Sequence, residues 1–301
     1  MTYKDNLAGV FPPMVTPFDS DEILFSDLAE NVRKYNKTGL RGYFVLGTNG
    51  EFKSLSVKER LQVLKTVVEN SAEEKIVMAG TSAESTKQTI DITLEAAKIG
   101  VDQVSLLMPH FFKKYMTDKV IIDYITDVAD KSPVPVVLYN NPSVASGVLI
   151  SVEVIKRVSS HPNVIGMKDS SKNNYQNYIS VTQNEDFHLI AGSASFFYDV
   201  LKAGGVGGVL SLSNVFPEEC VKLYNLFQEG KTEQAEIQNN KLVSLNKKVS
   251  GFKGVAAVKG AMELAGFKGG TPRRPLKGLS KKEEKELKIN IREKGFLGEN
   301  K

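Results

Sequence analysis

A lysine at the end of an apolar run is the side chain best placed to do chemistry. Residues 164–168 read Val-Ile-Gly-Met-Lys, and on an extended strand Lys168 shares its face with Val164 and Gly166. If that face points into a barrel interior, the amine emerges among apolar walls, where loss of hydration lowers the pKa of an ammonium group. A neutral amine attacks carbonyl carbons and forms a Schiff base. The pattern predicts a nucleophilic lysine, with a structural lysine paired to a carboxylate as the alternative interpretation.

Two further segments carry polar side chains where apolar runs end. Tyr139 closes the run 134–139, and its phenol could relay protons to a carbinolamine and to the substrate oxygen. The run 42–46 leads into residues 47–50, Gly-Thr-Asn-Gly, whose successive backbone amides suit a small carboxylate, with the Thr48 hydroxyl beside them. An ordinary half-buried tyrosine and a tight turn without a ligand fit the same residues, so both alternatives stay open.

Eight short apolar runs predict the strands that must position these groups. They span residues 10–15, 42–46, 76–80, 104–108, 134–139, 164–168, 188–191 and 205–212. The intervals between them are roughly 20 to 35 residues long, which is the length of a strand with its crossover helix in a βαβ unit. The runs are continuously apolar rather than alternating, as in parallel sheets covered on both faces. We therefore predict an α/β fold, a (β/α)8 TIM barrel, with functional residues at the carboxyl ends of its strands.

Helix signals fall in the intervals and beyond the last strand. The expected helix ends are a capping box of Ser56 with Glu59, a helix from near Ser85 to Gly100, and two helices that begin at Thr117 and Ser151. Past residue 212 we predict helices at 217–229, 232–248, 255–265 and 280–293. We accordingly expect one TIM-barrel domain over residues 1–301, of which roughly 217–301 is a helical extension.

Composition excludes several classes of protein. Apolar residues make up 41% and charged residues 25% of the 301 residues, as in ordinary globular chains. Lys plus Arg number 39 and Asp plus Glu 35, and the net charge of +4 is too small and dispersed to indicate nucleic-acid binding. One cysteine, Cys220, and three histidines argue against a metal cluster, and no run reaches the length of a membrane helix. With no apolar core of a signal peptide at the amino terminus, we expect a cytoplasmic protein.

A doubly wound open sheet is the alternative fold. It normally carries a glycine fingerprint after its first strand, but here the first apolar run leads into Thr16, Pro17 and Phe18. Neither Gly-x-Gly-x-x-Gly after that run nor a Walker sequence anywhere is present, so the dinucleotide and P-loop interpretations lose their main support.

Three motifs taken together resemble a known family. In chain order they are Gly47-Thr48-Asn49-Gly50-Glu51, Tyr139-Asn140-Asn141-Pro142 and Gly166-Met167-Lys168-Asp169-Ser170. With them the chain resembles, over nearly its whole length, the dihydrodipicolinate synthase and N-acetylneuraminate lyase superfamily of pyruvate-dependent class I aldolases. The resemblance implies a (β/α)8 barrel, commonly a homotetramer, with no metal or organic cofactor. It also implies Lys168 as the Schiff-base lysine, Tyr139 as the proton-relay phenol, and Thr48 as its hydroxyl partner and pyruvate-carboxylate contact.

Departures from the family pattern bear on the substrate. Dihydrodipicolinate synthases carry two threonines in the first motif, whereas Asn49 follows Thr48 here. They place a tyrosine in the loop after the fourth strand, where this chain has Phe111. Their arginine for the aldehyde substrate's carboxylate follows the Tyr-Asn-x-Pro motif, and residues 143–147 supply none. These departures argue against that synthase.

The residues of these motifs more closely resemble those of 4-hydroxy-2-oxoglutarate aldolase, which shares the asparagine after the hydroxyl residue and the Gly-Met-Lys-Asp-Ser motif. This similarity implies Asn49 and Ser170 as substrate contacts. Phe111 departs from the aldolase too, so the proton relay would run through water or the substrate would differ. The synthase, a 2-keto-3-deoxy sugar acid aldolase and a non-catalytic barrel that senses a 2-oxo acid stay open as alternatives.

Three more residues have structural interpretations beside functional ones. His110 could replace the missing hydroxyl as an acid-base group, with a surface or interface histidine as the alternative. Asp169 is turned away from Lys168 by strand parity and is expected to accept hydrogen bonds. Phe111 and Phe112 would leave rings exposed on a monomer, so we expect a homo-oligomer, a dimer or tetramer, that binds a small 2-oxo acid rather than nucleic acid or membrane.

Overall fold

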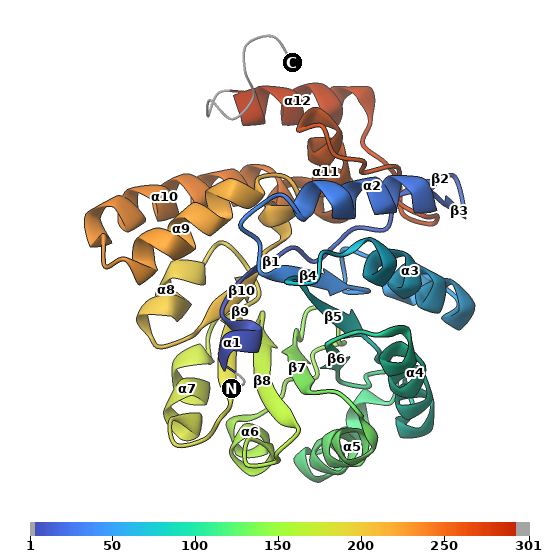
Figure 1. Ribbon diagram of the computed structural model, residues 1–301, viewed down its shortest axis with the longest axis vertical. Helices are drawn as coiled ribbons and strands as arrows, with labels where there is room; N and C mark the ends of the chain where they lie inside the picture. Colours follow the sequence, from blue (N-terminus) through green and yellow to red (C-terminus); the bar gives the residue numbers. More distant parts are fainter. Residues whose placement is uncertain (1–3, 293–301) are drawn as a thin grey trace. The chain divides into compact units, whose positions relative to one another are not determined.

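The computed structural model describes residues 4–292 of the 301-residue chain. Its main sheet contains the strands β1 (Gly9–Phe11), β4 (Gly42–Val45), β5 (Ile76–Gly80), β6 (Gln103–Leu107), β7 (Val136–Asn140), β8 (Val164–Asp169), β9 (His188–Ala191) and β10 (Gly207–Val209). From β5 to β10, strands that neighbour in the sheet follow one another along the chain. Helices separate the strands (Figure 1), and the architecture is the (β/α)8 TIM barrel predicted from the sequence. The described residues fall into two compact units, residues 4–9 with 76–209 and residues 10–75 with 210–292.

The first unit is built on the parallel strands β5 to β10. Every residue of these strands except Ile76 and His188 is buried, which explains why they read as continuous apolar runs. In the pairing of β7 with β8, Tyr139 stands opposite Lys168. The two side chains predicted to carry the chemistry therefore project from adjacent strands, near the carboxyl end of each.

Three helices of the first unit begin at the capping residues that the sequence indicates, and these are α4 (Thr86–Ile99), α5 (Asp118–Lys131) and α6 (Val152–Val158). The other helices of this unit are α1 (Lys4–Leu7), η2 (Lys113–Tyr115), α7 (Tyr175–Thr182) and α8 (Phe197–Lys202). The hydroxyls of Ser85, Thr117 and Ser151 each accept a backbone N–H bond from the first turn of their helix. Gly100 ends α4 in the left-handed conformation, with a φ of 102°. These caps fix where each loop after a strand gives way to a helix.

The second unit contains β4, most of β1, and several elements that flank them. These are β2 (Phe18–Asp19), β3 (Glu22–Ile23), α2 (Phe25–Tyr35), η1 (Phe52–Ser54), α3 (Val57–Asn70) and η3 (Ser211–Asn214). The predicted capping box of Ser56 and Glu59 is present at the start of α3. The antiparallel pair of β2 and β3 was not predicted, because two-residue strands leave no apolar run to detect. Strand β1 ends earlier than predicted because Pro12 and Pro13 lack N–H donors for a ladder.

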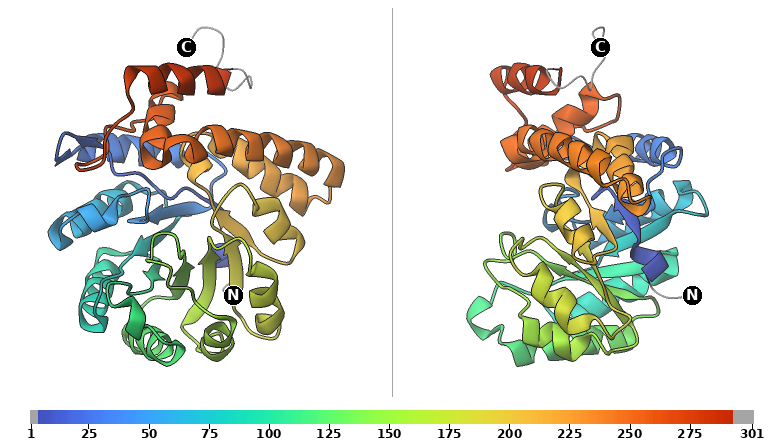
Figure 2. Two further views of the ribbon diagram at one scale, coloured as in Figure 1. Left: turned by 180° about the vertical axis from the view of Figure 1, so that it is seen from behind. Right: turned by 90° about the vertical axis from the view of Figure 1, so that its left-hand side faces the viewer.

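Four helices follow the last strand in the second unit. They are α9 (Pro217–Gln228), α10 (Thr232–Lys248), α11 (Ser250–Leu264) and α12 (Lys281–Arg292). Helices α9 and α10 lie side by side (Figure 2) and bury Cys220, Leu223, Leu242 and Leu245. Helix α11 starts before the predicted residue 255, but Lys253 and Gly254 have non-helical backbone angles, so the regular helix begins where predicted. Residue 293, the last of the predicted fourth helix, lies outside the described residues; the single domain over 1–301 stays a prediction.

Candidate active site

Lys168 stands at the carboxyl end of β8 with only 3% of its surface exposed. Its Nζ lies 4.0 Å from the centroid of the Tyr139 ring on β7. Burial lowers the pKa of Lys168, while the charge and hydrogen bonding of Tyr139 oppose that shift. A lysine in this setting supplies the neutral amine more readily than an exposed lysine, which is the condition for attack on a carbonyl.

Tyr139 is also held by the loop after β7. The Nδ2 of Asn141 donates to the Tyr139 hydroxyl oxygen at 2.8 Å, and the Ser143 hydroxyl donates to the Oδ1 of Asn141 at 2.6 Å. Because Asn141 is two residues from Tyr139, it lies on the same face of the extended backbone. These bonds fix the direction of the phenol. No role for Asn141 was predicted, although the repeated asparagine after Tyr139 is a signal for it.

A buried polar network ties the ends of β7 and β8 together. The carboxylate of Asp169 accepts hydrogen bonds from Asn140 Nδ2 at 2.8 Å and from the backbone and hydroxyl of Ser171, both at 3.0 Å. The Oδ1 of Asn140 accepts the N–H of Ile150 at 3.1 Å. Asp169 is thus the hydrogen-bond acceptor that strand parity predicts. This network keeps the backbone on which Tyr139 and Lys168 stand rigid.

Ser170 is half-buried just beyond β8, and a missing side chain on the next strand makes room for it. A Cβ built on Gly192, which follows β9, would lie 1.9 Å from the Ser170 hydroxyl oxygen and 2.7 Å from the carbonyl oxygen of Asp169. Glycine is therefore required at position 192. The backbone N–H of Ser170 donates to the carbonyl of Asn140 at 2.8 Å, which places Ser170 in the same group as Tyr139 and Lys168.

Thr48 and Asn49 belong to the second unit, in the turn that follows β4. Thr48 is half-buried, and Asn49 is buried and donates to the Ser211 hydroxyl at 3.0 Å. Within the turn, the amide of Gly50 bonds the carbonyl of Gly47 at 3.1 Å and the amide of Glu51 bonds that of Thr48 at 3.0 Å. The sequence predicts that successive amides here hold a carboxylate, but the amides at positions 50 and 51 close the turn instead.

In the segment after β6, His110 contacts Met108 and Glu84. Its Nδ1 lies 3.1 Å from the carbonyl oxygen of Met108 and 3.5 Å from Glu84 Oε1, and its backbone N–H donates to Glu84 Oε2 at 2.9 Å. These contacts engage the histidine with its own segment and with Glu84. Phe111 and Phe112 are 77% and 60% exposed, as the sequence predicts for an isolated chain.

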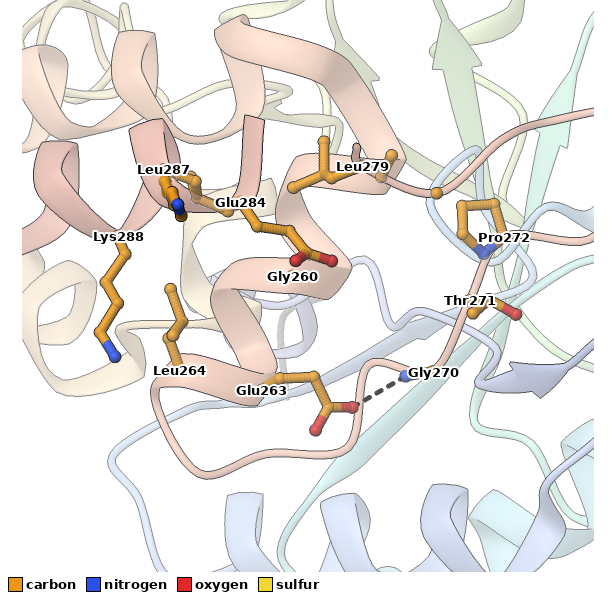
Figure 3. A pocket seen from close by; sticks show the side chains of 13 residues that line it. Gly260, Glu263, Leu264, Gly270, Thr271, Pro272, Leu279, Glu284, Leu287 and Lys288 are labelled. Carbon is orange, nitrogen blue, oxygen red and sulfur yellow. Dashed lines mark hydrogen bonds between the residues drawn. The ribbon is translucent and has the colours of Figure 1, made fainter. Parts of the chain in front are cut away.

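Two hollows of the molecule are lined by none of these residues. One of about 450 Å³ is lined by α11, α12 and the segment between them (Figure 3). Another of about 580 Å³ is lined by α5, α6 and the residues after α6. Neither contains a predicted site residue. Across residues 4–292, no three side chains of the types His, Cys, Asp and Glu come together as a metal site.

Comparison with known families identifies the class of protein. Residues 6–294 match the dihydrodipicolinate synthetase family. The chain belongs to this family, and it is a lyase.

Individual relatives cover almost the whole chain. An uncharacterised DapA-like lyase of Halobacterium salinarum is 34% identical over 97% of this chain and 95% of its own length. A probable mitochondrial 4-hydroxy-2-oxoglutarate aldolase of Emericella nidulans is 30% identical, over 96% of this chain and 95% of its own. The crystal structure of dihydrodipicolinate synthase from Thermotoga maritima is 27% identical and superposes with a TM-score of 0.91, over 97% of this chain and 99% of that one. The relatives thus share the fold but carry names for two different reactions.

Within the described range, none of the helices combines the length and the apolar character needed to cross a lipid bilayer.

Proposed function

We propose that the chain is a class I aldolase that cleaves or forms a 2-oxo acid through a Schiff base on Lys168. The observation that supports this most is the buried amine of Lys168, with its lowered pKa, against the ring of Tyr139. The amine adds to the substrate carbonyl, and loss of water gives an iminium ion. Removal of the proton from the 4-hydroxyl breaks the bond between C3 and C4, and the electron pair enters the iminium as an enamine. Protonation of the enamine and hydrolysis release pyruvate and restore the lysine.

Tyr139 is proposed to move the protons of these steps. Its hydroxyl is held by Asn141, so the phenol keeps one orientation while it exchanges a proton with the carbinolamine and the leaving oxygen. Thr48 is assigned the part that the family resemblance gives it, a hydroxyl partner in the relay and a contact for the pyruvate carboxylate. Asn49 and Ser170 are assigned as substrate contacts on the same ground.

The substrate we propose is 4-hydroxy-2-oxoglutarate, which gives pyruvate and glyoxylate. Support comes from Asn49 and the Gly-Met-Lys-Asp-Ser motif, and from the aldolase name of the Emericella nidulans relative. Dihydrodipicolinate synthase is the second candidate, because the Thermotoga maritima structure with that name has the same fold. Phe111 and the absence of arginine in residues 143–147 weigh against the synthase.

The chain is proposed to work in the cytoplasm as a homo-oligomer, a dimer or tetramer. The exposed rings of Phe111 and Phe112, which stack edge to face with centroids 5.0 Å apart, support burial against a second copy. Light scattering should give a mass of two or four chains for the wild type, and Phe111→Asp should lower it. A monomeric wild type contradicts this part of the proposal.

Borohydride trapping tests the chemistry directly. Incubation with pyruvate and borohydride should attach a reduced pyruvyl group to Lys168, and peptide mapping should find it there. Lys168→Ala should lose the label. A label on another lysine, or none, contradicts the proposal; trapping without turnover of any 2-oxo acid would leave the sensor alternative. A panel of 2-oxo acids assayed for pyruvate release then separates the aldolase from the synthase.

A further inference from the structure

A second buried lysine lies in the helical extension and meets the turn that carries Thr48. On α11, the Nζ of Lys259 is 2.6 Å from Oε1 of Glu51, and each side chain is only 1% exposed. The same ammonium donates to the carbonyl oxygens of Thr16 and Thr271, both at 2.8 Å. The ammonium therefore makes two hydrogen bonds to backbone carbonyls and one ion pair. A fully buried ion pair is costly to desolvate unless such extra bonds complete it.

Glu51 is the residue that closes the Thr48 turn. It has a left-handed backbone conformation, with a φ of 53°, which residues other than glycine rarely adopt without support. Its N–H donates to the carbonyl of Thr48 at 3.0 Å. Its Oε2 accepts the backbone N–H of Arg273 at 2.9 Å. Both oxygens of this carboxylate are therefore bound by residues of the carboxyl-terminal extension, and the strained residue they hold is bonded to Thr48.

The segment that supplies these partners is itself anchored to α11. Oε1 of Glu263 accepts the N–H groups of Gly269 at 2.7 Å and of Gly270 at 3.0 Å, the second of which is drawn in Figure 3. Position 269 has no room for a side chain, because a Cβ there would lie 2.2 Å from the Lys259 carbonyl oxygen. The extension therefore presents a fixed surface to Glu51.

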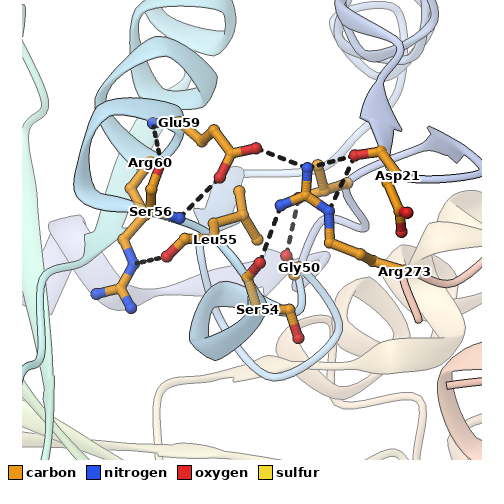
Figure 4. Close-up of polar contacts among 9 residues, drawn as sticks. Asp21, Gly50, Ser54, Leu55, Ser56, Glu59, Arg60 and Arg273 are labelled. Atoms are coloured by element: carbon orange, nitrogen blue, oxygen red, sulfur yellow. Dashed lines mark hydrogen bonds and ion pairs between the residues drawn. The ribbon is translucent and has the colours of Figure 1, made fainter. Parts of the chain in front are cut away.

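Arg273 contacts residues that follow the same turn in the chain (Figure 4). Its guanidinium donates to the carbonyl oxygen of Ser54 at 2.9 Å and to Oε1 of Glu59 at 2.6 Å, and it also bonds the carbonyl of Asp21. Glu51 in the Thr48 turn and residues that follow the turn are thus bound to one segment of the extension.

We propose that Lys259 and Glu51 are positioning residues for Thr48, so that the carboxyl-terminal extension sets the conformation of the turn that supplies the relay hydroxyl. This inference rests on the proposed function, because it takes Thr48 as part of the proton relay. The pair touches no reacting atom and acts through the backbone bond from Glu51 to Thr48.

The pair should also make the positioning of Thr48 depend on pH. Burial lowers the pKa of Lys259 to about 8, although Glu51 opposes the shift. Glu51 is in direct contact with Lys259. Glu263 lies one turn further along α11. Arg273 and Lys259 approach the same aromatic ring, that of Phe18, at 4.8 Å and 4.6 Å from its centroid. Above about pH 8, Lys259 loses its proton and the attraction that holds Glu51 weakens. Proton transfer should therefore decline on the alkaline side.

The experiment compares Lys259→Met with Lys253→Met, a matched control on α11 whose exposed lysine pairs with Glu283 at 2.8 Å. Two readouts with pyruvate are used. Borohydride trapping at equilibrium reports Schiff-base formation, and exchange of the pyruvate methyl protons in heavy water reports proton removal. Lys259→Met should keep its trapping and lose between about tenfold and a hundredfold in exchange rate, while Lys253→Met matches the wild type.

Two further variants test the same inference if Lys259→Met does not fold. The double change Glu51→Gln with Lys259→Met leaves no unpaired buried charge and should show the same slow exchange. Lys259→Arg should restore exchange and move its alkaline decline to higher pH. Wild-type exchange in folded Lys259→Met or in the folded double variant overturns this inference, as does a wild-type profile without an alkaline decline. A wild type that neither traps nor exchanges pyruvate overturns the proposed function instead.

Discussion

Two buried lysines, Lys168 on β8 and Lys259 on α11, differ in what surrounds them. At Lys168, burial lowers the pKa against the opposing influence of the Tyr139 phenol. At Lys259, burial lowers the pKa to about 8 against the opposing influence of the Glu51 carboxylate. Burial alone therefore does not make a lysine a nucleophile. A phenol beside the amine can exchange protons during a reaction. A carboxylate together with two backbone carbonyl oxygens instead stabilises the charged form of the amine at neutral pH.

Exchanging each lysine for arginine gives the sharpest test of this contrast. Arginine keeps the positive charge but cannot form a Schiff base, so Lys168→Arg should lower kcat by several orders of magnitude. Lys259→Arg keeps the cation that Glu51 needs and should retain activity within about tenfold of the wild type. Steady-state pyruvate release measures both. Equal losses in the two variants, with both proteins folded, would show that the two lysines do not differ in role.

Removing the Tyr139 hydroxyl should have the next largest effect. Tyr139→Phe should lower kcat about a hundredfold to ten-thousandfold, because the proposed relay loses its acid-base group. Tyr139 raises the pKa of Lys168, so its removal should lower that pKa further. The acid limb of kcat/KM, which rises as Lys168 loses its proton, should then move to lower pH. If the acid limb of kcat/KM does not move, Tyr139 does not act on the pKa of Lys168. Tyr115→Phe, at an exposed tyrosine of the same unit, is the matched control.

The smallest effect is expected for Glu59, which follows the Thr48 turn in the chain and binds Arg273 of the extension. The hydrogen bond from Arg273 lowers the pKa of Glu59 to about 2. A carboxylate with a depressed pKa stabilises the fold fully above its unfolded pKa of about 4.3, and this contribution disappears as the pH falls toward 2. Glu59→Gln should lower the free energy of unfolding by about 0.5 to 1 kcal/mol at pH 7 and by less below pH 4.

Denaturant unfolding at the two pH values checks this prediction. Glu69→Gln is the control, because Glu69 lies 3.7 Å from Lys65 in an exposed pair of the same helix and should change nothing measurable. A loss for Glu59→Gln that is equally large in acid would point to packing rather than charge as its cause.

Most of the fold was predictable because parallel strands covered on both faces leave continuous apolar runs. All eight strands of the main sheet lie within or next to the predicted runs, and the hydroxyl caps of α3 to α6 were found from single residues. The predicted strands at the positions of β1 and β10 extend beyond the ends of the observed strands. Apolar residues continue past them, but prolines follow β1 and a short 3-10 helix, η3, follows β10.

The candidate site was predictable only in part. Lys168 and Tyr139 end apolar runs, so a local pattern finds them. The pairing of Glu51 with Lys259 joins residues far apart in the sequence, and no local periodicity marks a lysine within a helix as the partner of a turn residue. Asn141 also needed the structure, since its bond to Tyr139 depends on the direction that the backbone takes after β7.

The missing side chain at Gly192 has a consequence for judging relatives of this chain. A Cβ there would collide with a main-chain oxygen as well as with Ser170, so the barrel backbone itself excludes any larger residue, whatever reaction is catalysed. A homologue that had abandoned turnover would still retain glycine at this place. Ser170 is under no such geometric constraint and is the position where divergence should accompany a new acceptor.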